Sequence, residues 1–138
     1  MEIDRLRRDS GKMKNDQIKI VLDTNFLLIP ETKKIDIFKK IKEKKPKSKF
    51  IILKSVEKEL QKMKTRESKI ALQIIKQKKL QTHEVETNKK HTDDIIIEYA
   101  EKENAEVATN DKELKKRCIN KKIPIIYLRS GKKIETKK

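Results

Sequence analysis

Apolar residues gather in short blocks along this chain, and long stretches of charged residues separate the blocks. Blocks of consecutive Ile, Val and Leu are typical of parallel strands that are buried on both faces, or of the first turns of packed helices. The strands predicted in this way are residues 18–23, 50–53, 107–108 and 124–128, with an ambiguous edge strand at 82–87 and a short strand around Ile134.

Between the predicted strands, apolar residues recur every three or four positions, as in helices with one buried face. The predicted helices cover residues 35–44, 55–63, 67–79, 92–100 and 110–121. Ser55 is expected to cap the second of these helices, and Asn110 and Glu113 have capping-box spacing at the start of the last. Strands that alternate with helices predict an α/β fold, with a central parallel sheet flanked by helices.

The chain divides into a short arm and one domain. Residues 1–16 carry several Arg and Lys but little apolar pattern after Leu6, so they are predicted to form a basic, flexible N-terminal arm. Residues 17–135 are the expected folded domain, because a chain of 138 residues suits one domain and shows neither an internal repeat nor a low-complexity linker.

The composition is strongly basic, with 38 Lys and Arg against 22 Asp and Glu and a formal net charge of +16. Such a charge favours a polyanionic partner, and RNA is the expected one. A membrane is not expected, since no apolar run approaches the roughly 20 residues that span a bilayer. Aromatic residues are 4% of the chain and Trp is absent, so RNA contacts are expected mainly at phosphates. A single cysteine, Cys118, fits a reducing cytoplasm.

Four acidic residues follow predicted strands or begin helices, namely Asp23, Glu59, Asp93 and Asp111. In an open parallel sheet, the segments after the strands meet at one edge, where ligands bind. Four carboxylates at that edge would repel one another, and Mg²⁺ or Mn²⁺ suits oxygen ligands of this kind. One ion can activate water while a second stabilises the leaving oxygen of a phosphodiester. The pattern therefore predicts a metal-dependent nuclease.

Each acid also has a simpler interpretation. Asp93 and Asp111 suit the first turn of a helix, where the helix dipole favours negative charge. Glu59 alone is typical of a solvated helix residue. Asp23 is the hardest to explain without a partner, because an acid that ends a buried strand costs stability.

Four motifs in sequence order resemble the PIN domain. They are Asp23-Thr24-Asn25-Phe26, Val56-x-x-Glu59-Leu60, Asp93-Asp94-x-Ile96 and Ala108-Thr109-Asn110-Asp111-x-x-Leu114. The resemblance spans roughly residues 18–135. It is nearest to the archaeal relatives of the eukaryotic PIN endonuclease that cleaves pre-ribosomal RNA. The phrases VLDTNFLLI, TNDKEL and PIIYLR resemble that branch more than ordinary VapC toxins.

The resemblance implies a three-layer, Rossmann-like α/β fold, dependence on Mg²⁺ or Mn²⁺, and RNA hydrolysis that leaves 5′-phosphate and 3′-hydroxyl ends. By position, the catalytic and metal-binding acids are Asp23, Glu59, Asp93 and Asp111. Supporting or substrate-binding roles fall to Asn25, Thr109 and Asp94. The expected partners are structured RNA, including ribosomal RNA, a ribosome-assembly factor or an acidic antitoxin, and a second copy of the chain in a homodimer.

Two classes of function stay open at this point. One is an active endoribonuclease, acting either in ribosomal RNA processing or as the VapC-type toxin of a toxin–antitoxin pair. The other is a catalytically silent RNA-binding PIN module of a ribosome-assembly complex. Metal-free cleavage by His83 and His91 is a weaker alternative, because both lie in a polar stretch typical of a surface. The intact set of acids favours the active enzyme.

Overall fold

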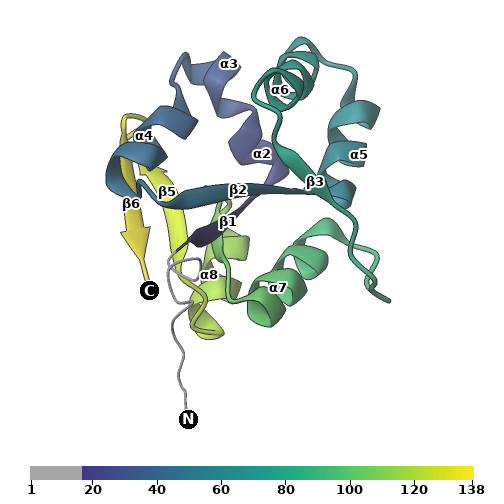
Figure 1. Cartoon of the computed structure of the whole chain (residues 1–138), viewed down its shortest axis with the longest axis vertical. Helices are drawn as coiled ribbons and strands as arrows, with labels where there is room; N and C mark the ends of the chain where they lie inside the picture. The colour runs from purple at the N-terminus through teal and green to yellow at the C-terminus, as the bar shows by residue number, and fades with distance from the viewer. Residues whose placement is uncertain (1–16) are drawn as a thin grey trace.

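Six strands form one sheet in the spatial order β3-β2-β1-β4-β5-β6 (Figure 1). They are β1 (Ile18–Leu22), β2 (Ser48–Leu53), β3 (Gln81–His83), β4 (Glu106–Ala108), β5 (Ile125–Arg129) and β6 (Lys133–Lys137). The computed structural model describes residues 17–138, so the predicted arm of residues 1–16 lies outside the described part of the chain.

Neighbouring strands from β3 to β5 run parallel, and β6 is antiparallel to β5. Strand β1 lies between β2 and β4, where Ile20 pairs with Phe50 and Leu22 pairs with Ala108. Residues 20–22 have no exposed surface, as expected for a strand covered on both faces. The α/β fold with a central, mostly parallel sheet that the sequence predicts is confirmed.

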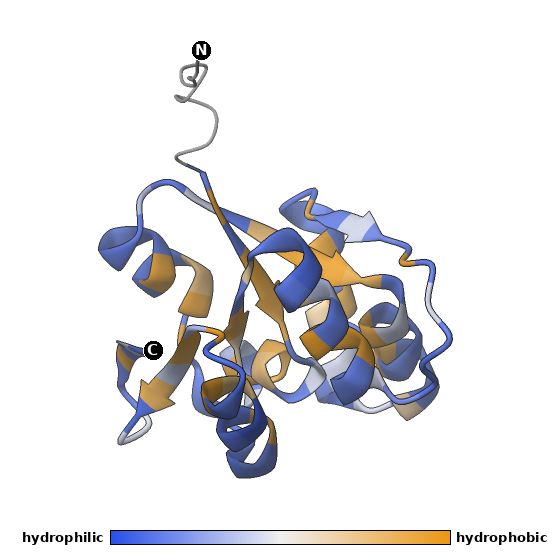
Figure 2. Ribbon diagram, turned by 90° about the horizontal axis from the view of Figure 1, so that it is seen from below, coloured by the Kyte–Doolittle hydropathy of each residue, from blue (hydrophilic) through white to orange (hydrophobic). Residues whose placement is uncertain are grey.

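Helices cover both faces of this sheet. One face carries α2 (Thr24–Leu27), α3 (Ile29–Lys33), α4 (Ile37–Lys44), α5 (Lys54–Met63) and α6 (Arg66–Gln77), and the other carries α7 (Thr92–Glu103) and α8 (Lys112–Asn120) (Figure 1). Apolar residues, orange in Figure 2, lie mainly on the strands and on the helix sides that face them. Within residues 17–138, no helix is both long and apolar enough to cross a membrane.

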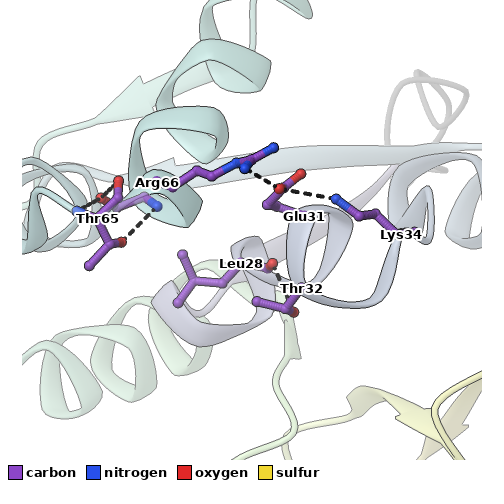
Figure 3. Close-up of polar contacts among 7 residues, drawn as sticks. Leu28, Glu31, Thr32, Lys34, Thr65 and Arg66 are labelled. Carbon is purple, nitrogen blue, oxygen red and sulfur yellow. Dashed lines mark hydrogen bonds and ion pairs between the residues drawn. The ribbon is translucent and has the colours of Figure 1, made fainter.

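Helix α6 begins with a complete capping box. Thr65 Oγ1 accepts a hydrogen bond from the backbone of Ser68 at 3.0 Å, and Ser68 Oγ accepts one from the backbone of Thr65 at 2.9 Å. The next residue, Arg66, contacts Glu31 of α3 at 3.2 Å, and Glu31 also pairs with Lys34 (Figure 3). These ion pairs lie where α3 and α6 pack together.

Two predicted helix caps are wrong. Helix α5 begins at Lys54, directly after Leu53, so Ser55 lies inside the first turn, and its buried hydroxyl has no hydrogen-bond partner among the described residues. Asn110 does not cap α8, because its side chain bonds to the backbone of Leu128 in β5 instead. It donates to the Leu128 carbonyl at 2.9 Å and accepts from the Leu128 N–H at 2.7 Å.

Candidate active site

Two of the predicted acids follow neighbouring parallel strands. Asp23 comes directly after β1, and its backbone N–H donates to the carbonyl of Ala108 in β4 at 3.0 Å. Asp111 comes shortly after β4 and caps α8, since its Oδ1 accepts from the N–H of Leu114 at 3.0 Å. Both acids therefore lie at the edge where the parallel strands end, which is where α/β sheets bind ligands.

Thr109 joins these two acids. Its hydroxyl donates to Asp23 Oδ2 at 2.8 Å and accepts from the backbone N–H of Asp111 at 3.0 Å. Thr109 is fully buried and Asp23 is only 5% exposed, so these hydrogen bonds form away from solvent, where they are electrostatically stronger. One threonine thus positions the carboxylate of the first acid and the backbone of the second.

Glu59 lies in α5, the helix that follows β2. Thr24 Oγ1 donates to Glu59 Oε1 at 2.5 Å, and Thr92 Oγ1 donates to Glu59 Oε2 at 2.9 Å. Because Thr24 adjoins Asp23 and Thr92 adjoins Asp93, these bonds bring α5 to the end of β1 and to the start of α7. Glu59 is exposed to solvent, but both of its carboxylate oxygens are held in place.

The charges of these acids act on one another. Burial raises the pKa of Asp23 from 3.8 to about 6, although the hydrogen bond from Thr109 lowers it. The negative charges of Asp93 and Asp111 raise this pKa further. Burial also raises the pKa of Asp93, and the charges of Asp111 and Glu59 add to the rise. The four carboxylates therefore share one region of negative potential.

Arg117 of α8 lies beside the same acids. It donates to Asp94 Oδ1 at 2.6 Å, and this hydrogen bond holds the pKa of Asp94 below its usual value. Its positive charge also opposes the rise in the pKa of Asp93. An open groove of about 440 Å³ lies here, and its lining includes Arg117, Glu59, His91, Asp93 and Asp94. The groove therefore combines an acidic site with a guanidinium group, which binds phosphate well.

The donor chemistry of this site fits a hard divalent cation. Asp23, Glu59, Asp93 and Asp111 offer carboxylate oxygens, which Mg²⁺ and Mn²⁺ favour. Burial, and after it the repulsion from nearby acids, raises the pKa of Asp23 and Asp93, and a cation among them would favour their ionised forms. Within residues 17–138, no group of three or more Asp, Glu, His or Cys side chains is arranged so that it could hold a metal ion. A bound Mg²⁺ commonly takes only one or two protein carboxylates and keeps several waters.

Other candidate residues are placed differently. Asn25 in α2 is exposed and takes no part in the hydrogen bonds that hold Asp23 and Glu59. His91 precedes α7 and is exposed, and it lines the groove. Cys118 is buried, and burial raises the pKa of its thiol to about 11, so it is a core residue rather than a reactive thiol.

Three residues of the site are not predicted from the sequence, namely Thr24, Thr92 and Arg117. The two threonines adjoin motif acids, and that adjacency is the signal by which they could have been found. Arg117 has no comparable signal, because its contact with Asp94 depends on how α7 packs beside α8.

With this sheet and this acidic edge, the chain belongs to the PIN-like domain family, whose model matches residues 20–131. The resemblance inferred from the four motifs is confirmed. A solved structure of the PIN domain endonuclease Utp24 shares 30% sequence identity with this chain at a TM-score of 0.77, and the match covers 88% of this chain and 92% of that one.

A second solved structure supports the fold alone. It is a domain of a functionally unknown protein from Methanocaldococcus jannaschii DSM 2661, with 16% identity and a TM-score of 0.57. The match covers 82% of this chain and 92% of that domain. No curated protein sequence matches the chain.

Proposed function

We propose that this chain is a metal-dependent endoribonuclease that hydrolyses RNA phosphodiester bonds. The observation that carries the proposal is that Asp23 and Asp93 have a raised pKa, first because of burial and then because of the negative charges of Asp111 and, for Asp93, Glu59. This mutual effect supports a shared site of Asp23, Glu59, Asp93 and Asp111 at one edge of the sheet. Acids whose pKa values are perturbed by burial and by one another are typical of functional sites, and two of these four, Glu59 and Asp93, line the groove. Membership of the PIN-like family and the similarity to a PIN domain endonuclease support the same conclusion.

In this proposal, the four acids hold Mg²⁺ or Mn²⁺, which when bound activates water and stabilises the charge that develops on the phosphodiester. The chain's own residues provide the geometry. Thr109 orients the carboxylate of Asp23 through its 2.8 Å hydrogen bond. Thr24 and Thr92 orient Glu59 by donating to its two carboxylate oxygens. Restraint of this kind keeps metal ligands in a productive arrangement.

Arg117 is suited to contact the RNA phosphate near the acids. Its side chain is 39% exposed at the groove and pairs with Asp94 at 2.6 Å. A guanidinium group can bind a phosphate with two parallel hydrogen bonds. In this assignment, Asp94 orients Arg117 before RNA binds and is not itself a metal ligand.

RNA is the proposed substrate because the chain carries a net charge of +16, which attracts a phosphate backbone. Ribosomal RNA processing within a ribosome-assembly complex is the proposed role. It is preferred to a VapC-type toxin role, because the sequence phrases around Asp23 and Asp111 resemble the branch that cleaves pre-ribosomal RNA.

A cleavage assay on structured RNA with Mg²⁺, Mn²⁺ or EDTA tests the proposal. Asp23→Asn should nearly abolish cutting, while RNA binding persists or tightens because a negative charge facing phosphates is removed. Asp36→Asn is the matched control, since it changes an exposed aspartate that caps α4 and asparagine caps about equally well.

Two outcomes would contradict this function. Undiminished cutting by Asp23→Asn would place the chemistry elsewhere, with His83 and His91 the next candidates. RNA binding by the unmodified chain without any metal-dependent cutting would indicate a catalytically silent module.

A further inference from the structure

A basic surface lies on α8 and on the hairpin of β5 and β6. Four lysines (Lys112, Lys115, Lys116 and Lys137) surround Tyr127 at a pocket of about 310 Å³, which we call the Tyr127 surface. The three lysines of α8 are spaced at i, i+3 and i+4, so they lie on one side of the helix. Lys137 reaches the same pocket because β6 pairs with β5 in an antiparallel register.

Tyr127 is half-buried and packs against the core, so it keeps part of its surface exposed in a fold that buries the other Phe and Tyr residues. At 9% exposure or less, the buried Phe and Tyr residues are Phe26, Phe38, Phe50 and Tyr99. The Nζ atom of Lys115 lies 4.7 Å from the centroid of the Tyr127 ring, so a polar group from the surface can reach the ring face. Lys115 and Tyr127 are both half-buried, and a contact of this kind away from a fully desolvated site is generally weaker than the stacking of a nucleobase on an aromatic ring. We therefore expect that a base can replace the ammonium group.

The charges of the Tyr127 surface fit an anionic ligand. Among the described residues, no acidic side chain lines the pocket. Glu135, which pairs with Tyr127 across the hairpin, faces Arg129 at 3.8 Å. Lysines at i and i+4 on a helix, as at Lys112 and Lys116, repel one another. An extended chain of phosphates would offset this repulsion at several points.

We propose that the Tyr127 surface binds a single-stranded RNA segment next to the cleavage site, with one base stacked on Tyr127 and flanking phosphates on the lysines. The proposal rests on the endoribonuclease function above. Lys112 directly follows Asp111, and at about 1.5 Å per helical residue Lys115 lies roughly 6 Å along the axis from Asp111. At roughly 3.4 Å per stacked nucleotide, one or two nucleotides would cover this distance. One stacked base is also compatible with the chain's low aromatic content.

Tyrosine fluorescence tests the stacking directly, because the chain contains two Tyr and no Trp. A short uridine oligomer is titrated into the full chain in EDTA, so that no metal-dependent cutting occurs. The oligomer should quench the emission saturably. Tyr127→Phe should bind it with similar affinity, and the remaining emission of the buried Tyr99 should be unquenched. Tyr127→Leu keeps apolar bulk but removes the ring, so its affinity should fall about 5- to 100-fold. Absence of quenching, or unchanged affinity in Tyr127→Leu, would overturn the proposal.

Two double variants test the lysines while removing the same charge. Lys112→Gln with Lys116→Gln alters the Tyr127 surface, whereas Lys69→Gln with Lys76→Gln alters exposed positions of α6 on the opposite face of the sheet. At about 0.7 per phosphate contact, the first variant should reduce the salt slope of binding by roughly 1 to 1.5, and the second should leave it nearly unchanged. Equal reductions of the salt slope in the two variants would contradict specific binding of RNA at the Tyr127 surface.

Competition with polyglutamate separates RNA from an acidic protein as the ligand. If polyglutamate displaces the uridine oligomer at equal charge concentration, the surface belongs to an acidic polypeptide and the proposal fails. The result is independent of catalysis. If these variants lose affinity but no RNA is cut with Mg²⁺ or Mn²⁺, the Tyr127 surface stands and the endoribonuclease proposal falls. If RNA is cut but the variants bind normally, the endoribonuclease proposal stands and the proposal for the Tyr127 surface falls.

Discussion

The hydroxyl of Thr109 donates a 2.8 Å hydrogen bond to Asp23 Oδ2 across 86 residues of sequence. The two residues follow the neighbouring strands β4 and β1, and both are buried. The bond lowers the pKa of Asp23, but burial has the larger effect, and the pKa is raised to about 6. The protein alone therefore compensates this acid only in part, and the proposed cation would complete the compensation.

Removal of this hydroxyl should destabilise the protein. Thr109→Val keeps the shape of the side chain but leaves the buried Asp23 without its donor, so the free energy of unfolding at pH 7.5 should fall by about 1 to 3 kcal/mol. Urea denaturation measures the change, and Thr109→Ser is the control because it retains the hydroxyl. Equal stability of the Val and Ser variants would show that the hydrogen bond contributes nothing.

The raised pKa of Asp23 predicts a specific pH dependence of stability in EDTA. A carboxyl group whose pKa is higher in the folded state binds protons more tightly there, so its contribution is favourable at low pH and is lost as pH rises from about 4 through about 6. Relative to the unmodified chain, Asp23→Asn should therefore gain up to about 3 kcal/mol of unfolding free energy between pH 4 and pH 7.5.

Thermal or urea unfolding at a series of pH values measures this gain. Saturating Mg²⁺ should reduce it, because the cation stabilises the ionised Asp23. The unmodified chain and Asp23→Asn would follow parallel pH profiles if Asp23 titrated normally in the folded state.

Asp111 has two separable roles in this interpretation. It caps α8 through the 3.0 Å bond from Leu114, and it is a proposed metal ligand. Asp111→Asn should retain the cap, whereas Asp111→Ala should cost about 0.5 to 2 kcal/mol of stability. Both variants should lose metal-dependent cutting, because both remove the carboxylate. Full cleavage activity in Asp111→Asn would show that Asp111 serves only as the cap of α8.

The sequence predicts the central strands and the place of the acids for a common physical reason. A strand buried on both faces must be apolar throughout, so Ile20 to Leu22 stand out, and an acid directly after them marks the strand end. Parallel strands end at the same edge, which brings Asp23 and Asp111 together without further information.

Contacts between distant elements are less predictable. Asn110 has the chemistry of a helix cap, but β5 lies close enough for its amide to bond with Leu128 instead. The link between Glu59 and Thr92 likewise requires α5 and α7 to meet, and no local pattern in the sequence encodes that meeting.

Asp93 and Asp94 are neighbours, but they should differ in function. Arg117 pairs with Asp94 at 2.6 Å, so the charge of Asp94 is already offset, whereas burial and nearby acids raise the pKa of Asp93. Asp93→Asn should lower the cleavage rate by roughly two orders of magnitude or more. Asp94→Asn should lower it by at most about tenfold. Single-turnover cleavage rates at saturating enzyme compare the two, and the opposite ranking would make Asp94 the metal ligand.

The net charge of +16 predicts that RNA binding depends steeply on salt. Lysines and arginines release counterions from the phosphates that they neutralise, and each contact on a single strand contributes about −0.7 to the slope of log affinity against log salt. Four to six contacts would give a slope of roughly −3 to −4. Filter binding at several salt concentrations measures it. If the charge served only solubility, binding would be weak even at low salt and the slope would be near zero, because no phosphate contact would form. A flat profile would therefore leave the RNA assignment resting on the acids alone.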